Sequence, residues 1–148
     1  VRTGERVYVA CLDAYPSCDI AIFAAAVADY RPAIVEENKI KKQEEKLTLQ
    51  LVKTGDMAKS LGEIKRSNQL NIGFALETND EQDNAIAKRK KKNFDLIVLN
   101  STRDKGATFG TDSNKITIYN KNGKIMETQL LPKDQIANLI LDEIIKLF

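Results

Sequence analysis

The stretch Asn71–Asn100, NIGFALETNDEQDNAIAKRKKKNFDLIVLN, decides the fold. Two short apolar runs, at 71–77 and 95–100, flank a polar stretch at 80–93 that suits a helix. Short continuous apolar runs are typical of strands covered on both faces, and a helix between two such strands is the usual crossover of a parallel pair. The stretch therefore predicts a strand–helix–strand unit of an α/β fold.

The same alternation of strands and helices extends towards the N-terminus. The apolar run at 19–26 predicts another strand covered on both faces, and LTLQLV at 47–52 alternates as a strand does. We expect helices at 56–66 and at 4–15, the latter with Thr3 as its N-cap. This order predicts a mostly parallel sheet with four parallel strands. Because no strand precedes the first helix, we expect the chain to be part of a longer protein.

The last third of the chain has a different pattern. Residues 115–131 contain two strand-like runs around Asn120–Gly123, and a glycine at such a turn is a hairpin signal. Residues 133–148 predict an amphipathic helix. No repeat or linker interrupts residues 1–148, so we expect one domain with a Rossmann-like three-layer αβα fold, a mostly parallel sheet and a C-terminal β-hairpin and helix. The apolar set of the last helix is Ile136, Leu139, Ile140, Ile144 and Leu147.

The composition narrows the classes of function. With 23 Lys+Arg against 21 Asp+Glu, the formal charge is +2, which disfavours a nucleic-acid or anionic-membrane partner. No apolar run approaches the ~20 residues of a membrane helix. The two cysteines, Cys11 and Cys18, favour a reducing cytoplasm, and we expect them to be small buried hydrophobes. Because histidine is absent, the chemistry must use Lys, Asp, Asn, backbone groups and bound ions.

Polar or turn-forming residues follow each predicted strand. Asp29 lies just after 19–26, a lysine and a tight turn follow 47–52, and polar loops follow 71–77 and 95–100. In open parallel α/β sheets, ligands bind beyond the carboxyl ends of the strands. The sequence therefore predicts one ligand site along that edge.

Two small-residue segments at this edge have two interpretations each. At Thr54–Asp56, Gly55 would let the backbone approach a ligand, but Thr54 or Asp56 could simply cap the following helix. Small side chains at 24–28 could likewise allow close ligand approach or helix–sheet packing. The sequence leaves both questions open.

Five consecutive cations occupy 88–92 at the end of the helix predicted at 80–93. Successive helical residues are rotated by ~100°, so one flat surface cannot contact all five. The acidic start and basic end of this helix suit its dipole without any ligand, and a nucleic-acid patch is disfavoured. Lys88 and Lys92, four residues apart, point the same way and suit a triphosphate chain.

The connection at 30–46 is long, charged and, we expect, without strands. Loops of this length in a compact domain are usually functional covers or disordered. It contains Lys39, Lys41 and Lys42, and a cover over an anionic site would need one lysine to reach inward.

These motifs together resemble one family. AAAVADYRPA with NKIKKQ, then LVKTGDMA, GFALETND, AKRKKKNFDLIVLN and ATFGTDSNKITIY are similar to the phosphopantothenate–cysteine ligase, or phosphopantothenoylcysteine synthetase, family, in order from about residue 19 to the end. The resemblance implies a bacterial-type, cytoplasmic enzyme of coenzyme A synthesis. Such ligases activate the carboxylate of 4′-phosphopantothenate with CTP and Mg²⁺, which gives an acyl-cytidylate and pyrophosphate. The amine of cysteine then displaces CMP.

The resemblance also implies roles for individual residues. Asp29 and Phe74 would hold the nucleotide, and Lys39 would reach the reacting groups as a catalytic and nucleotide-binding residue. In the family the flexible strap that carries this lysine crosses to a neighbouring subunit, so a homodimer is implied. The remaining implied residues are Thr54, Gly55, Asp56 and Met57 as the nucleotide cradle, Lys88 and Lys92 on the phosphates, and Ala25 and Ala26 near the acyl group.

The chain departs from the family pattern in two respects. Gly55 stands where the family usually has proline. The family's Gly-rich segment and catalytic asparagine belong upstream, so we expect this chain to be the C-terminal part of the ligase domain. FMN would be a cofactor only if a decarboxylase domain precedes it.

Two other functions remain open from the sequence. One is a non-catalytic nucleotide-binding or regulatory module, and the other is an RNA-binding module that would rest on the cation run. The ligase interpretation requires Asp29, Phe74, Lys88 and Lys92 to surround one nucleotide, and we expect all four on the same side of the sheet.

Overall fold

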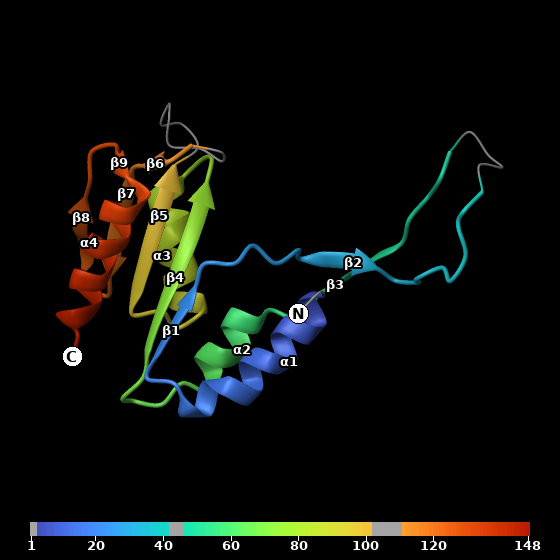
Figure 1. Cartoon of the computed structure of the whole chain (residues 1–148), viewed down its shortest axis with the longest axis horizontal. Helices are drawn as coiled ribbons and strands as arrows, with labels where there is room; N and C mark the ends of the chain where they lie inside the picture. Colours follow the sequence, from blue (N-terminus) through green and yellow to red (C-terminus); the bar gives the residue numbers. More distant parts are fainter. Residues whose placement is uncertain (1–2, 42–45, 102–110) are drawn as a thin grey trace.

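A computed structural model describes residues 3–41, 46–101 and 111–148. Its main sheet has five strands in the order β1-β4-β5-β7-β8 (Figure 1). The first three are parallel to one another, and β7 and β8 add an antiparallel hairpin. The strands are β1 (Ile20–Phe23), β4 (Leu70–Glu77), β5 (Leu96–Ser101), β7 (Ile116–Asn120) and β8 (Gly123–Glu127).

Helices cover both faces of this sheet. On one face α4 (Lys133–Ile145) contributes to a core with the strands, and on the other α3 (Glu81–Lys91) and α2 (Met57–Glu63) cover a second core. Because successive strand residues point to opposite faces, β5 alternates between the two cores. The three-layer αβα class is therefore confirmed. The buried core on the α4 face is Ile72, Leu96, Val98, Ile116, Ile118, Ile136, Ile140 and Ile144, and the buried core on the α3 face is Ala75, Ala85, Phe94, Ile97, Leu99 and Tyr119.

The predicted helices and hairpin are present with small changes of length. The first helix, α1 (Gly4–Ala14), begins after Thr3, whose hydroxyl accepts a hydrogen bond from the Arg6 N–H at 3.3 Å. A 3-10 turn, η1 (Tyr15–Ser17), connects α1 to β1. The hairpin turns at Gly123, whose φ of 124° suits only glycine. Each described helix is too short or too polar to span a bilayer.

The prediction that 47–52 joins the main sheet is wrong. The strand there is β3 (Leu51–Lys53), and it pairs antiparallel with β2 (Tyr30–Pro32) in a separate ribbon. The main sheet therefore has three parallel strands rather than four, and the connection at 30–46 contains a strand. Figure 1 shows the ribbon and the segments beyond it extending away from the rest of the fold. Alternation of apolar and polar residues signals a strand but not the sheet to which it belongs.

Burial predictions failed at the outer elements. In the described residues β1 pairs only with β4, so it is an edge strand, and Ile20 and Ile22 are 38% and 48% exposed rather than covered. Leu147, assigned to the apolar face of the last helix, lies beyond the end of α4 and is exposed. Cys11 and Cys18 are half-buried rather than buried.

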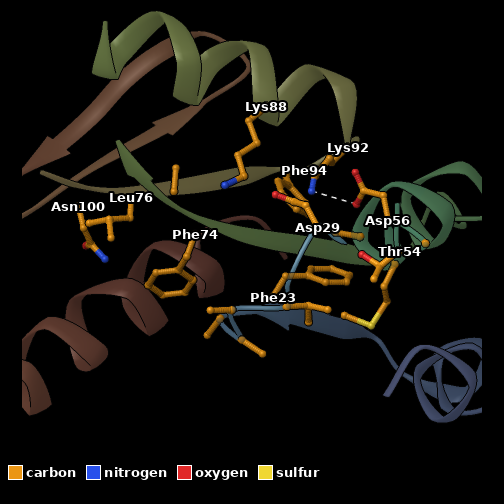
Figure 2. A pocket seen from close by; sticks show the side chains of 18 of the residues that line it. Phe23, Asp29, Thr54, Asp56, Phe74, Leu76, Lys88, Lys92, Phe94 and Asn100 are labelled. Carbon is orange, nitrogen blue, oxygen red and sulfur yellow. Dashed lines mark ion pairs between the residues drawn. The ribbon is translucent and has the colours of Figure 1, made fainter. Parts of the chain in front are cut away.

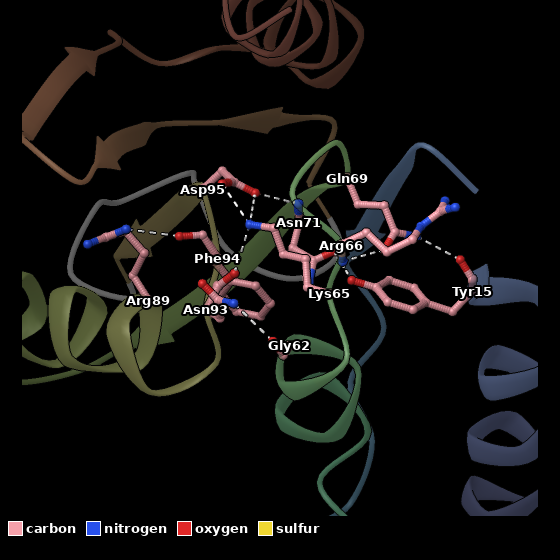
Figure 3. Close-up of polar contacts among 10 residues, drawn as sticks. All are labelled: Tyr15, Gly62, Lys65, Arg66, Gln69, Asn71, Arg89, Asn93, Phe94 and Asp95. Carbon is pink, nitrogen blue, oxygen red and sulfur yellow. Dashed lines mark hydrogen bonds and ion pairs between the residues drawn. The ribbon is translucent and has the colours of Figure 1, made fainter. Parts of the chain in front are cut away.

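A polar network fixes the amino ends of the parallel strands (Figure 3). The Tyr15 hydroxyl donates to Asn71 Oδ1 at 2.9 Å, and Gln69 Nε2 donates to the Tyr15 carbonyl at 2.8 Å. Asp95 accepts from Lys65 Nζ at 2.6 Å and from the Asn71 N–H at 2.7 Å. These bonds join η1, β4 and the start of β5, so the carboxyl ends of the strands meet at the opposite edge.

Candidate functional site

A cavity of about 490 Å³ lies at the carboxyl ends of β1, β4 and β5 (Figure 2). Its size is typical of small-molecule sites. Segments that are far apart in the sequence form its walls: the residues after β1, the turn before α2, one side of α3 and the ends of β4 and β5. A cavity therefore lies at the edge of the sheet where the sequence predicts a ligand site. Residues 102–110, which follow β5, lie outside the described residues.

The structure brings together all the predicted site residues except Lys39. Lys39 does not line the cavity; it lies in the segment that follows β2 and extends away from the sheet (Figure 1). Lys41, in the same segment, is exposed, and Lys42 lies outside the described residues. The predicted residues that line the cavity are Ala25, Ala26, Asp29, Thr54, Gly55, Asp56, Met57, Phe74, Lys88 and Lys92.

The five cations at 88–92 divide as the helical spacing predicts. Lys88 and Lys92 both line the cavity, and Figure 2 shows the Lys88 ammonium directed into it. Lys90 and Lys91 are exposed and do not line it. Arg89 has a structural contact, because its guanidinium donates to the Phe94 carbonyl at 2.9 Å.

The turn before α2 caps the helix, and its residues also line the cavity. Thr54 donates its hydroxyl to the Ala28 carbonyl and its N–H to the Asp29 carbonyl at 2.9 Å, which joins the turn to the segment after β1. Asp56 caps α2, since its Oδ1 accepts from the Lys59 N–H at 3.1 Å. Both residues also line the cavity. Capping and a ligand site are compatible here.

Asp56 forms an ion pair across the cavity wall. Its Oδ1 lies 2.9 Å from Lys92 Nζ (Figure 2). Burial acts to raise the pKa of Asp56, but the bonds from Lys92 and Lys59 and the charges of Lys92 and Lys91 outweigh it, and the pKa is lowered below its ordinary value. Asp56 is therefore a carboxylate at neutral pH.

Aromatic rings form an apolar part of the wall that sequence reasoning missed. Phe94 and Phe23 both line the cavity with ring centroids 5.3 Å apart, and Phe94 is buried. Phe94 lies directly over Gly73, where a Cβ atom would be 2.1 Å from the ring. A glycine within an otherwise apolar strand was the available signal, because it often marks a close approach.

Phe74 does not lie on the predicted side of the sheet. It packs against the core on the α4 face, whereas Lys88 and Lys92 belong to α3 on the other face. Figure 2 shows Phe74 and Lys88 on opposite sides of β4. Phe74 follows Ile72 by two residues, so strand alternation sends both side chains to the same face. The cavity is nevertheless lined by residues from both faces of β4, since Phe74, Ala75 and Leu76 all belong to its wall.

Further polar residues line the cavity on the Phe74 side. Asn114 Nδ2 donates to Asn100 Oδ1 at 3.2 Å, and Lys133 begins α4 nearby. Asn114 lies in β6 (Ser113–Asn114), which pairs with β9 (Leu131–Pro132) just before α4. Sequence reasoning did not identify these residues, although Asn100, the polar residue that ends an apolar run, was visible.

The acidic residues of the cavity do not form a built metal site. Among the described residues, no group of three His, Cys, Asp or Glu side chains could hold a metal ion. Asp29 and Asp56 are the carboxylates that line the cavity, and Asp56 is paired with Lys92. Mg²⁺ commonly binds through one or two carboxylates, water and substrate phosphates, and the residues present fit only that arrangement.

The comparison with known families decides the assignment. The DNA/pantothenate metabolism flavoprotein C-terminal domain family matches residues 1–148. The chain belongs to this family. The coenzyme A biosynthesis bifunctional protein CoaBC of Bacillus subtilis (strain 168) is 44% identical over 144 residues, 97% of this chain and 35% of that protein. A cysteine/cysteine sulfinic acid decarboxylase from an unknown prokaryotic organism is 45% identical over 147 residues, 99% of this chain and 41% of that protein.

Two solved structures are also similar to this chain. The C-terminal domain of a CoaBC protein superposes with a TM-score of 0.77 at 35% identity, covering 97% of this chain and 62% of that one. A DNA/pantothenate metabolism flavoprotein from Streptococcus pneumoniae has a TM-score of 0.79 at 21% identity, which supports the fold alone. The family resemblance drawn from the motifs is thus confirmed. The chain spans less than half the length of the two curated relatives above.

Proposed function

We propose that this chain carries the ligase activity of coenzyme A biosynthesis, joining 4′-phosphopantothenate to cysteine with CTP. The observation that carries the proposal is the cavity, because the residues that the ligase family implies for the nucleotide line it together, apart from Lys39. The similarity to CoaBC of Bacillus subtilis over 97% of the chain supports it. The enzyme would work in the cytoplasm on small-molecule substrates.

The proposed reaction has two steps. A carboxylate oxygen of 4′-phosphopantothenate attacks the α-phosphorus of CTP; a P–O bond forms to it, pyrophosphate leaves, and the acyl-cytidylate results. The amine of cysteine then attacks the acyl carbon, an amide bond forms, CMP leaves, and the amine loses a proton. The first step brings two anions together, so cations must neutralise the developing charge. Lys88 and Lys92 are suitably placed on the cavity wall.

The cavity offers the nucleotide two different surroundings. On the α3 face it has ammonium groups and the turn before α2, and on the α4 face it has the Phe74 ring and the amides of Asn100 and Asn114. We infer that the phosphates bind on the α3 side and that the chain of the ligand passes around the end of β4. Mg²⁺, held mainly by phosphates and water, would supply further positive charge when bound.

We also propose that the chain is the C-terminal part of a ligase domain. Ile20 and Ile22 on β1 are exposed, although strands of a parallel sheet are normally covered, so a further segment would pair with this edge and cover them. The matched CoaBC C-terminal domain is longer than this chain, which covers 62% of it. FMN would bind only to a decarboxylase domain upstream.

The segments that extend beyond the ribbon support a homodimer in this proposal. Ile34, Val35 and Leu47, in the segments beyond β2 and β3, are 72%, 81% and 66% exposed. Exposed apolar side chains that gather in one patch are typical of protein interfaces, and we infer that these three belong to such a patch. In a dimer the segment that carries Lys39 would reach the cavity of the partner subunit, which reconciles its catalytic role with its position outside the cavity of its own chain.

Calorimetry on matched lysine variants tests the nucleotide site. Lys88→Met and Lys92→Met should each weaken CTP binding about tenfold or more, because each removes a charge-assisted contact. Lys90→Met is the control, since it makes the same change on α3 at an exposed position that does not line the cavity; its affinity should stay within about twofold. An equal loss of CTP affinity in all three variants would mean that these cations act only through the overall positive charge of α3 and not through direct contacts.

Product analysis separates the ligase from the other functions. With CTP, 4′-phosphopantothenate and cysteine, the complete protein that contains this chain should release CMP and pyrophosphate, and Lys39→Gln should slow acyl-cytidylate formation without loss of fold. Release of CO₂ from cysteine without CMP would instead favour the reaction named for the decarboxylase relative. An equal rise in the thermal unfolding midpoint with every nucleotide tested would indicate a regulatory module. A salt-sensitive rise with RNA alone would indicate RNA binding.

A further inference from the structure

Lys92 is held in place by a specific partner, unlike a cation free to move in solvent. Its Nζ lies 2.9 Å from Asp56 Oδ1, and the two side chains are only 20% and 38% exposed. The same carboxylate oxygen accepts the Lys59 N–H at 3.1 Å, so its position is fixed by the first turn of α2. Figure 2 shows the pair on the wall of the cavity. The ammonium is therefore tied to the backbone of another helix.

The ends of α2 and α3 are also joined below this pair. Asn93 Nδ2 donates to the Gly62 carbonyl at 2.9 Å. A Cβ atom on Gly62 would lie 2.2 Å from the Lys92 carbonyl oxygen, so the two backbones are in close contact there. Gly62 is at the opposite end of α2 from Asp56. The Asp56–Lys92 pair and the Asn93–Gly62 bond therefore hold both ends of α2 against the C-terminal end of α3. These contacts fix the position of the Asp56 carboxylate relative to Lys92.

The charge of Asp56 argues against a direct contact with the ligand. The proposed ligand carries a chain of phosphates, and a carboxylate beside it would be repelled. The Lys92 ammonium, in contrast, has three N–H donors. One donor to Asp56 leaves two for phosphate oxygens. A lysine side chain loses much rotamer freedom when it binds, and a partner that orders it beforehand reduces that loss.

We propose that Asp56 is a positioning residue: its carboxylate orders the Lys92 ammonium at the cavity wall so that this ammonium can bind the phosphates of the ligand. The carboxylate itself contacts no part of the nucleotide, and the turn at 54–57 contributes to the cradle through its backbone. The inference deepens the proposed function and rests on it for the identity of the ligand as a nucleoside triphosphate.

A double-mutant cycle on Asp56 and Lys92 tests this role. Asp56→Asn removes the charge but keeps a residue that caps helices well, so α2 should persist, which far-UV circular dichroism and the unfolding midpoint would check. The cycle uses Asp56→Asn, Lys92→Met and the double variant, and calorimetry measures the Kd of CTP and of inorganic tripolyphosphate. Asp56→Asn should raise both Kd values about fivefold in the original background. It should have no further effect when residue 92 is methionine.

The outcomes separate the role of Asp56 from the proposed function. Binding that is unchanged or tighter in Asp56→Asn, or an equal loss in both backgrounds, would overturn the positioning role while CTP binding by the original chain still supports the function. Tripolyphosphate binding without CTP binding would count against the nucleotide function. The Kd values of tripolyphosphate alone would then test the positioning role of Asp56. If the original chain bound neither anion, Lys92 would have no phosphate to receive and the positioning role would also be rejected.

Discussion

Replacing Gly73 by alanine should destabilise the fold through one defined clash. The new Cβ atom would lie 2.1 Å from Phe94 Cε2, 2.2 Å from Cδ2 and 2.7 Å from Cζ. Ordinary contact begins near 3.4 Å, so the ring would have to move by more than about an ångström. Phe94 is 3% exposed, and its carbonyl and N–H are bonded to Arg89 at 2.9 and 3.0 Å, so its backbone cannot follow easily.

The magnitude follows from two opposing effects. Overpacking of a core site costs about 1–3 kcal/mol. Replacing a glycine inside a strand by alanine gains about 0.5–1 kcal/mol. We expect a net loss of about 1–2 kcal/mol in the free energy of unfolding, or a Tm lower by roughly 2–8 °C. Urea titration followed by circular dichroism measures the first value, and thermal unfolding measures the second.

Two controls make the result specific. In Gly55→Ala the new Cβ would be 3.4 Å from the Tyr8 ring, an ordinary contact, so stability should be unchanged or higher by up to about 1 kcal/mol. Adding Phe94→Leu to Gly73→Ala should cost less than the two single losses combined, since the smaller side chain relieves the clash. Equal stability of Gly73→Ala and Gly55→Ala would refute the close-approach argument.

Three further predictions concern other parts of the fold. Lys65→Met should lower the free energy of unfolding, measured in urea, by about 3 kcal/mol, because it leaves the partly buried Asp95 carboxylate without its cation. Lys59→Met, the control at an exposed i,i+4 pair, should lower it by less than about 1 kcal/mol. Burial raises the pKa of Tyr15, so the contribution of its neutral hydroxyl to stability is present below about pH 10 and is lost as the pH rises through the folded-state pKa. Thermal unfolding midpoints measured across alkaline pH should therefore fall less steeply in Tyr15→Phe than in the original protein. Gly62→Ala should lower the thermal midpoint at least as much as Gly73→Ala, since its Cβ would meet a backbone carbonyl that cannot turn aside.

Local patterns were sufficient for the central unit of the fold. At 71–100 the apolar runs, the acidic start of the helix and its basic end all indicate the same structure, and β4, α3 and β5 follow within a residue or two of the prediction. The i,i+4 relation of Lys88 and Lys92 is likewise a property of the helix itself, so their common direction was predictable.

The predictions failed where the answer depends on distant parts of the chain. LTLQLV at 47–52 reads as a strand in any sheet, and only its antiparallel pairing with Tyr30–Pro32 places β3 in the ribbon. The side to which Phe74 points depends on which face α4 covers, and that follows from packing rather than from β4 alone. The Asp56–Lys92 pair joins the start of α2 to the end of α3, and β4 lies between these two helices in the chain. No local sequence motif therefore predicts this pair.

The two edges of the sheet have different physical characters, and this should separate effects on stability from effects on the proposed ligand binding. At the amino edge, the side chains of Tyr15, Gln69 and Asp95 form hydrogen bonds with neighbouring side chains or with nearby backbone. A substitution there should therefore change the folding free energy first. At the carboxyl edge, the polar groups line a cavity, and Asp56 leaves the Lys92 ammonium with donors to spare. A charge removed at this edge should therefore change affinity for anions more than it changes stability. Phe94 is the residue where the two effects meet, because it both fills the core and lines the cavity, and a displaced ring there should alter both measurements together.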